Sequence, residues 1–67
     1  MKLEYDKDVD AAYICIDDTV KSGKVKKTIE LNDNIILDFD ENDKLIGVEV
    51  LSASKILSKK VLSEKSF

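Results

Sequence analysis

Residues 37–49 read LDFDENDKLIGVE, and this stretch admits two interpretations. Counted from its first aspartate, it places acidic or amide residues at positions one, three, five and twelve of a calcium-binding loop. These candidate ligands are Asp38, Asp40, Asn42 and Glu49. Such a loop needs a glycine at position six and a helix on each side, whereas Asp43 stands there and the flanks alternate like strands. We therefore predict a β-hairpin with residues 41–43 at its tip and no metal, and keep the four residues as candidates for weak ion binding.

The same alternation of apolar and polar residues continues along most of the chain. It occurs in short segments rich in β-branched residues and predicts five strands, at residues 2–6, 11–17, 24–31, 34–39 and 44–51. The links contain turn-forming residues, so we expect consecutive strands to be antiparallel neighbours in a meander. After residue 51 the apolar spacing changes to three and four, which predicts a helix over 53–62 with Ser52 as its N-cap. The predicted fold is α+β, an antiparallel sheet of about five strands with one C-terminal helix packed on one face.

Two details of the sequence refine this fold. The motif LEYDKD from Leu3 resembles LDFDEN from Leu37 at an offset of 34 residues, and each leads into an alternating strand. Two similar hairpins in one sheet would explain the repetition. Gly47 lies inside a predicted strand, which indicates a bulge or a close approach by an aromatic ring such as Tyr13 or Phe39.

The composition argues against an enzyme and against a bound cofactor. The chain of 67 residues has no histidine, so it lacks the usual proton shuttle and the usual activating base for a serine or cysteine nucleophile. Two glycines cannot form a phosphate-cradling loop. Cys15 is the only cysteine and alternates with isoleucines, which favours a packed, reduced thiol. With no apolar run of signal-peptide or membrane-span length, we expect a cytoplasmic protein that does not enter a membrane.

The charge is unevenly distributed. Residues 1–51 carry 7 lysines and 13 acids, whereas residues 52–67 carry 4 lysines and 1 acid. A lysine-bearing helix could contact a nucleic acid, and this is the alternative function that we keep. The acidic net charge of −3 and the absence of arginine count against it, so we do not expect a nucleic acid as the partner.

The small size of the chain favours association with another protein. A domain of this length builds a marginal core, and nothing in the sequence provides a disulfide or a structural zinc site. One helix covers one face of a sheet, so apolar side chains elsewhere are left for a partner or for an exposed edge strand. We expect a homo-oligomer, a small protein partner, or both. The candidate interface residues are Tyr13, Cys15, Ile36, Leu45, Ile56 and Val61.

The motifs YDKDVDAAYICI (residues 5–16) and IILDFDENDKLIGVEVLSAS (residues 35–54) resemble the small bacterial and archaeal family known as domain of unknown function 2283. The resemblance covers roughly residues 3–57. Asp43 departs from a turn glycine that is frequent in the family, and Ala12 from a frequent leucine. The resemblance implies an antiparallel sheet with a C-terminal helix and no known activity. It also implies an antitoxin-like role as a hypothesis, because some members are associated with a neighbouring small toxin-like protein.

Overall fold

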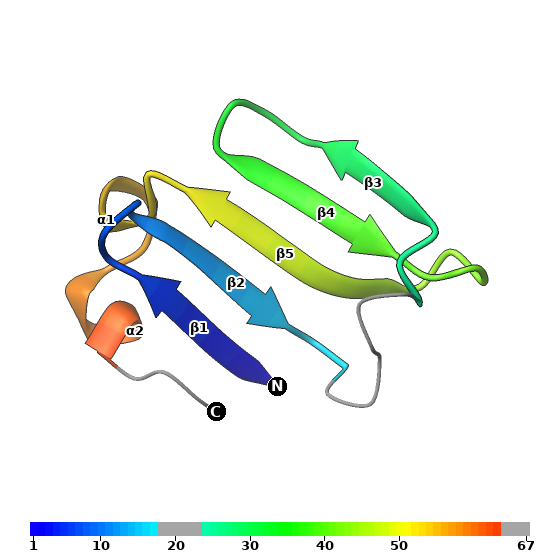
Figure 1. The fold of residues 1–67 in the computed structure, drawn as a ribbon, viewed down its shortest axis with the longest axis horizontal. Coiled ribbons are helices and arrows are strands. Elements are labelled where there is room, and N and C mark those ends of the chain that lie inside the picture. The colour runs from blue at the N-terminus through cyan, green and yellow to red at the C-terminus, as the bar shows by residue number, and fades with distance from the viewer. Residues whose placement is uncertain (18–23, 64–67) are drawn as a thin grey trace.

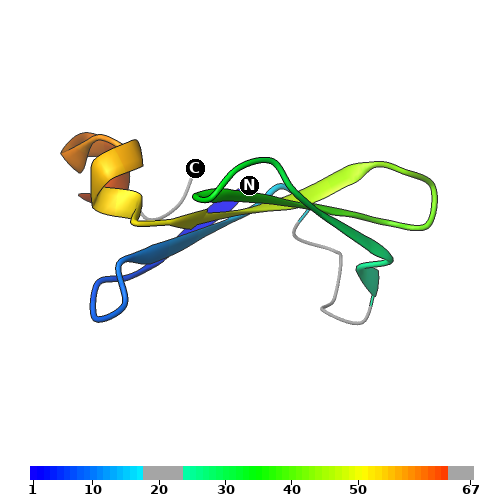
Figure 2. The ribbon, with the colours of Figure 1, turned by 90° about the horizontal axis from the view of Figure 1, so that it is seen from above.

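A computed structural model describes residues 1–17 and 24–63 of the chain. It contains strands β1 (Lys2–Asp6), β2 (Ala11–Cys15), β3 (Lys27–Glu30), β4 (Ile35–Phe39) and β5 (Leu45–Leu51), followed by helices α1 (Ala53–Ile56) and α2 (Lys59–Ser63) (Figure 1). Every strand pairing is antiparallel. Both helices lie on the same side of the sheet (Figure 2). The predicted fold class is therefore confirmed. Within the described part of the chain, neither helix is long and apolar enough to cross a membrane.

The strand order is β1-β2-β5-β4-β3, which differs from the predicted meander. The pairs β1–β2, β3–β4 and β4–β5 form as predicted, but β2 pairs with β5 instead of β3, so β3 lies at the far edge of the sheet. The link from β2 to β3 is too long for a hairpin turn, and the turn predicted at residues 21–23 lies outside the described residues. β5 is the longest strand and is rich in apolar residues, so the central position buries it best.

The repeated motif corresponds to the two hairpins. Leu3 pairs with Ile14 in the first hairpin, and Leu37 pairs with Val48 in the second. Ile14 and Val48 also pair with each other where β2 meets β5. The two hairpins are thus related by an approximate two-fold axis through this pair. β3 has no counterpart beside β1 in the described residues.

The predicted helix at 53–62 is present as two short helices. α1 ends because Leu57 adopts an extended backbone, with φ −105° and ψ 147°. Ser58 then begins α2, since its carbonyl accepts a hydrogen bond from the Leu62 amide and its hydroxyl accepts one from the Val61 amide. The break lets Leu57 and Leu62 both pack against the sheet.

The start of α1 is capped by Asp10 rather than by Ser52. Ser52 has a left-handed backbone (φ 54°) and makes no side-chain cap, because it turns the chain from β5 into the helix. Asp10 Oδ1 instead accepts a bond from the Ser54 amide at 3.0 Å, and its Oδ2 accepts one from the Ser54 hydroxyl at 2.7 Å. The Tyr5 hydroxyl donates to the same carboxylate at 2.7 Å. Asp10 therefore ties β1 and the first turn to α1.

The buried core lies between the helices and the strands β1, β2 and β5. The buried cluster consists of Leu3, Ala12, Val50, Ala53 and Leu62. No residue of β3 is buried, and the residues of β4 are at most half-buried. The helices thus cover only about half of one face of the sheet, and among residues 1–17 and 24–63 no element covers the β3–β4 half of that face.

We predict that Asp10→Ala lowers the melting temperature, because it removes the acceptor for the Tyr5 hydroxyl and for the Ser54 amide. The backbone of Asp10 is also left-handed (φ 53°), a conformation that alanine disfavours. The expected decrease is roughly 5–10 °C in thermal unfolding followed by circular dichroism. Asp8→Ala, in the same exposed turn, is the matched control and should stay within about 2 °C of the wild type.

The same variant gives a pH test. The hydrogen bonds from Tyr5 and Ser54 hold the pKa of Asp10 below its ordinary value of 3.8. Because the folded pKa is the lower one, this carboxylate stabilises the fold above pH 3.8, and the contribution is lost as the pH falls below it. The difference in melting temperature between wild type and Asp10→Ala should shrink below that pH. A difference in melting temperature that stayed constant below pH 3.8 would contradict the stabilising role of the Asp10 carboxylate.

Candidate interaction surface

A polar network crosses the face of the sheet opposite the helices. The Tyr13 hydroxyl donates to Asp38 Oδ2 at 3.1 Å, and the Thr28 hydroxyl donates to Asp38 Oδ1 at 2.9 Å. Gly47 lies between β2 and β4, and a Cβ at this position would collide with the Tyr13 hydroxyl. The predicted close approach of an aromatic ring to Gly47 is confirmed. The network joins side chains from β2, β4 and β3 over the glycine of β5.

The chemistry of this network is that of a structural lock. Burial is the main cause that raises the pKa of Tyr13 to about 12, followed by the hydrogen bond to Asp38 and the charge of that carboxylate. The phenol therefore stays protonated at neutral pH and serves as a hydrogen-bond donor.

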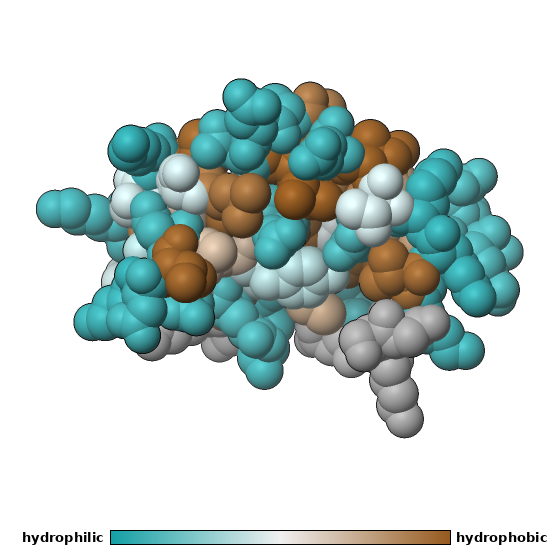
Figure 3. All heavy atoms as spheres, turned by 45° about the horizontal axis from the view of Figure 1, so that its top comes forward, coloured by the Kyte–Doolittle hydropathy of each residue, from teal (hydrophilic) through white to brown (hydrophobic). Residues whose placement is uncertain are grey.

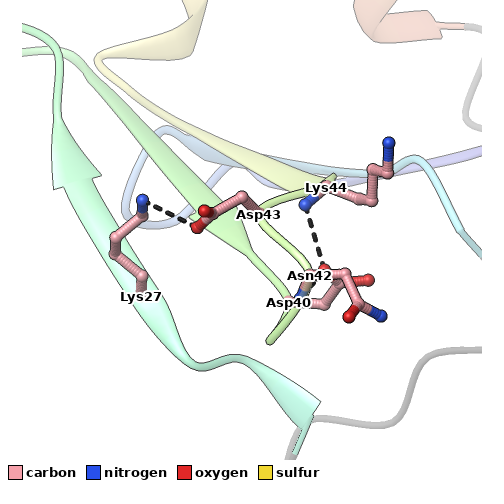
Figure 4. Close-up of polar contacts among 5 residues, drawn as sticks. All are labelled: Lys27, Asp40, Asn42, Asp43 and Lys44. Carbon is pink, nitrogen blue, oxygen red and sulfur yellow. Dashed lines mark hydrogen bonds and ion pairs between the residues drawn. The ribbon is translucent and has the colours of Figure 1, made fainter.

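The candidate ion ligands are separated by ordinary turn and sheet contacts. Asp38 belongs to the network just described, and Asp40 Oδ1 accepts hydrogen bonds from the amides of Asn42 and Lys44 at 2.8 and 3.0 Å (Figure 4). Asp43 takes the left-handed conformation (φ 61°) at the tip of the hairpin. In the described part of the chain, no three histidine, cysteine, aspartate or glutamate side chains come together as a metal site.

The end of this hairpin is held to β3 by Lys27. Its Nζ lies 3.0 Å from Asp43 Oδ1 (Figure 4). The same Nζ lies 5.2 Å from the centre of the Phe39 ring. The ion pair is exposed and contributes little alone, but the ring contact adds to it. Lys27 thus fixes one end of β3 against β4.

The predicted interface residues do not form a single surface. Tyr13, Cys15 and Ile36 are half-buried on the helix-free face, as their register shows. Leu45 is 38% exposed at the start of β5, and Ile56 is 44% exposed on α1. Val61 packs partly buried against the core. Glu49, on β5, pairs with Tyr13 and Ile36.

The larger apolar surface is one that the sequence alone did not identify. On the helix side of β3 and β4, beyond the reach of α1 and α2, the register aligns four apolar residues, which we call the open half-face: Ile29, Leu31, Ile35 and Leu37. Ile29 is 41% exposed and Leu31 is 60% exposed. Figure 3 brings the β3–β4 edge of the sheet forward, and brown apolar residues lie among polar ones along that edge. The alternation of 24–31 indicated these residues, but only the strand order shows that the helices do not cover them.

A shallow depression of about 670 Å³ lies between the first turn and α2. Asp6 and Asp8 line it together with Lys7 and Lys59, so charges of both signs offset each other. The remaining lysines of the helices, Lys55 and Lys60, are exposed. Neither the depression nor these exposed lysines form a binding site for a particular class of ligand.

Comparison with known proteins places the chain in a family. The family of proteins of unknown function DUF2283 matches residues 2–54. The chain belongs to the DUF2283 family. It is also 41% identical over 59 residues to the uncharacterized protein MJ0789 of Methanocaldococcus jannaschii. That match covers 87% of this chain and 46% of the archaeal protein, so the chain spans about half the length of this curated relative. No solved structure gives a significant match.

The motifs that carry the DUF2283 resemblance have structural roles in this chain. The tyrosine of the first motif and the serine of the last bind Asp10, while Tyr13, Asp38 and Gly47 form the lock across the sheet. These residues hold together strands that are distant in sequence. The family motifs of this chain therefore account for the fold of the domain.

We predict that Gly47→Ala destabilises the domain by about 1–3 kcal/mol, because the added methyl group forces the Tyr13 ring away from Asp38. Urea unfolding followed by circular dichroism measures the change. The cost should become much smaller in a Tyr13→Ala background, where the collision is absent. Equal costs in both backgrounds would contradict the proposed contact.

We also predict that Tyr13 ionises near pH 12 in a spectroscopic titration of the tyrosines. The folded pKa is raised, so the stabilising contribution is present below pH 10 and is lost as the pH rises from 10 towards 12. Asp38→Asn should lower the pKa of Tyr13 only in part, because burial is the larger cause. A complete return to 10 would contradict burial as the main cause of the raised pKa.

Proposed function

We propose that this chain is a non-enzymatic interaction module that binds another protein through the open half-face and the adjoining edge of β3. The observation that carries the proposal is the incomplete cover of the sheet. The helices pack over β1, β2 and β5, and every residue of β3 is exposed. Soluble domains seldom leave a contiguous apolar sheet face beside an unpaired strand unless a partner covers it.

The low free energy of unfolding expected for a small domain favours association with a partner. Burying the exposed parts of Ile29 and Leu31 is worth about 1 kcal/mol each, by the usual free energy per unit of apolar area. A chain of 67 residues has a stability of only a few kcal/mol, so a partner that covers these side chains adds a substantial fraction. Binding and folding stability are therefore coupled in this proposal.

The chemistry of the described residues gives the proposal its limits. Our proposal includes no catalytic step and no cofactor. It includes a reducing, cytoplasmic setting, which a free, half-buried thiol such as Cys15 favours. The partner is a second copy, another small protein, or both. A toxin-like protein that the module neutralises is the specific form that the DUF2283 resemblance favours.

The test is a binding experiment with charged substitutions on the open half-face. Ile29→Lys combined with Leu31→Lys replaces two exposed side chains, so the fold should persist while the apolar surface is lost. Val9→Lys is the matched control, because Val9 is 69% exposed but lies in the first turn. Tagged versions of the three proteins serve as bait in a lysate of the source organism.

We expect the wild type and Val9→Lys to retain the same protein and the double variant to lose it, with at least a tenfold reduction in recovered partner. Circular dichroism must show that all three remain folded. Retention of the same partner by the double variant would contradict the proposal.

A further inference from the structure

The outer edge of β3 has free backbone groups in a defined pattern. The Leu31 amide donates to the Ile35 carbonyl at 2.8 Å, and the register continues this pairing with Ile29 opposite Leu37. In an antiparallel ladder the residues between such pairs direct their amide and carbonyl groups to the other side. These residues are Thr28 and Glu30. Within residues 1–17 and 24–63, no strand pairs with this edge.

We propose that a second copy of this chain binds here, with its β3 antiparallel to the first and with the two-fold axis at Thr28. The inference rests on the proposed function and names the partner for the same surface. In this register Thr28 faces Thr28 of the second copy, a pairing that sheets favour. Lys26 lies just before β3, and its amide donates to the Phe39 carbonyl at 2.9 Å, so its backbone does not extend the outer edge. Its side chain reaches Glu30 of the second copy in this register, and the symmetry repeats this ion pair on the other side of the axis.

Charge and side-chain pairing distinguish this register from its neighbours. The open half-faces of the two copies lie on the same side of the joined sheet only if the two-fold axis places one residue of β3 directly opposite the same residue of the second copy. An axis at Lys27 would place two lysines directly opposite each other, which is unfavourable. An axis at Ile29 would place Glu30 opposite Thr28 and leave both charges without a partner. Only the axis at Thr28 pairs each lysine of position 26 with an acid.

The lysines of an edge strand usually discourage pairing. Here the lysines discourage pairing with a strand of arbitrary sequence. They do not discourage pairing with a second β3, because two-fold symmetry places opposite charges next to each other. Leu31, directly after β3, is 60% exposed in the single chain and lies beside this edge. Self-pairing is therefore the association that this short strand permits.

The dimer would also enlarge the surface of the proposed function. Because the axis is perpendicular to the sheet, the open half-faces of both copies lie on the same side and become continuous. Ile29 and Leu37 of each copy then line the middle of one sheet shared by the two chains. A single short chain presents a small apolar surface, whereas the dimer presents two of them side by side to a further protein.

Charge-reversal variants test the register. Glu30→Lys and Lys26→Glu each place like charges opposite one another, twice in every dimer. Each should raise the dimer dissociation constant about tenfold or more in sedimentation equilibrium. The double variant Lys26→Glu/Glu30→Lys restores opposite charges and should return to within about threefold of the wild type. Glu41→Lys, a reversal in the exposed β4–β5 turn, is the control and should leave the constant unchanged.

Mixing gives the most specific readout. The two single variants should associate with each other better than either does with itself, because every pair across the mixed interface is then of opposite sign. A wild type that stays monomeric at millimolar concentration, or single variants that dimerise like the wild type, would overturn the self-pairing. If such a monomer still captured a protein that Ile29→Lys/Leu31→Lys loses, the proposed function would stand without the dimer. Loss of both effects would reject both.

Discussion

One constraint governs the fold, which is that the helices cover only part of one face of the sheet. A five-stranded sheet has two faces, and the described part of the chain provides two short helices after it. Asp10 fixes the first of these helices beside β1 and the first turn, so the helices can reach only β1, β2 and β5. Everything on the β3 side of the sheet is therefore held by strand pairing and by a few side-chain contacts. The exposed β3 and the open half-face follow from that position of the helices.

Two polar contacts join elements of the sheet in addition to the small buried core. The contact of Tyr5 with Asp10 joins elements at the helical end of the sheet, and the contact of Tyr13 with Asp38 joins β2 to β4 on the other face. Both involve a tyrosine whose pKa is raised, so each stays a neutral donor at physiological pH. Gly47 makes the second contact sterically possible. The residues that carry the family pattern in this chain thus hold its elements together, and the proposed binding surface lies elsewhere.

The local features of the fold could be predicted from the sequence, and the long-range ones could not. Alternation located the hairpins, and Asp43 at the glycine position together with the alternating flanks distinguished a hairpin from a calcium loop, because these signals depend on neighbouring residues. The pairing of β2 with β5 and the capping of α1 by Asp10 join residues far apart in sequence, and no local pattern encodes them. The open half-face follows from the strand order, so it was hidden while a meander was expected.

The central claim is that the edge of β3 is an interface, and amide hydrogen exchange at that edge tests it most directly. The amides of Thr28 and Glu30 point away from β4, so in a single chain they exchange with solvent almost freely. The account predicts that both become protected as the protein concentration is raised, while the amide of Ile29, which is paired with β4, changes far less. Rapid exchange of Thr28 and Glu30 at every concentration, and also in the presence of any protein that the chain captures, would contradict it.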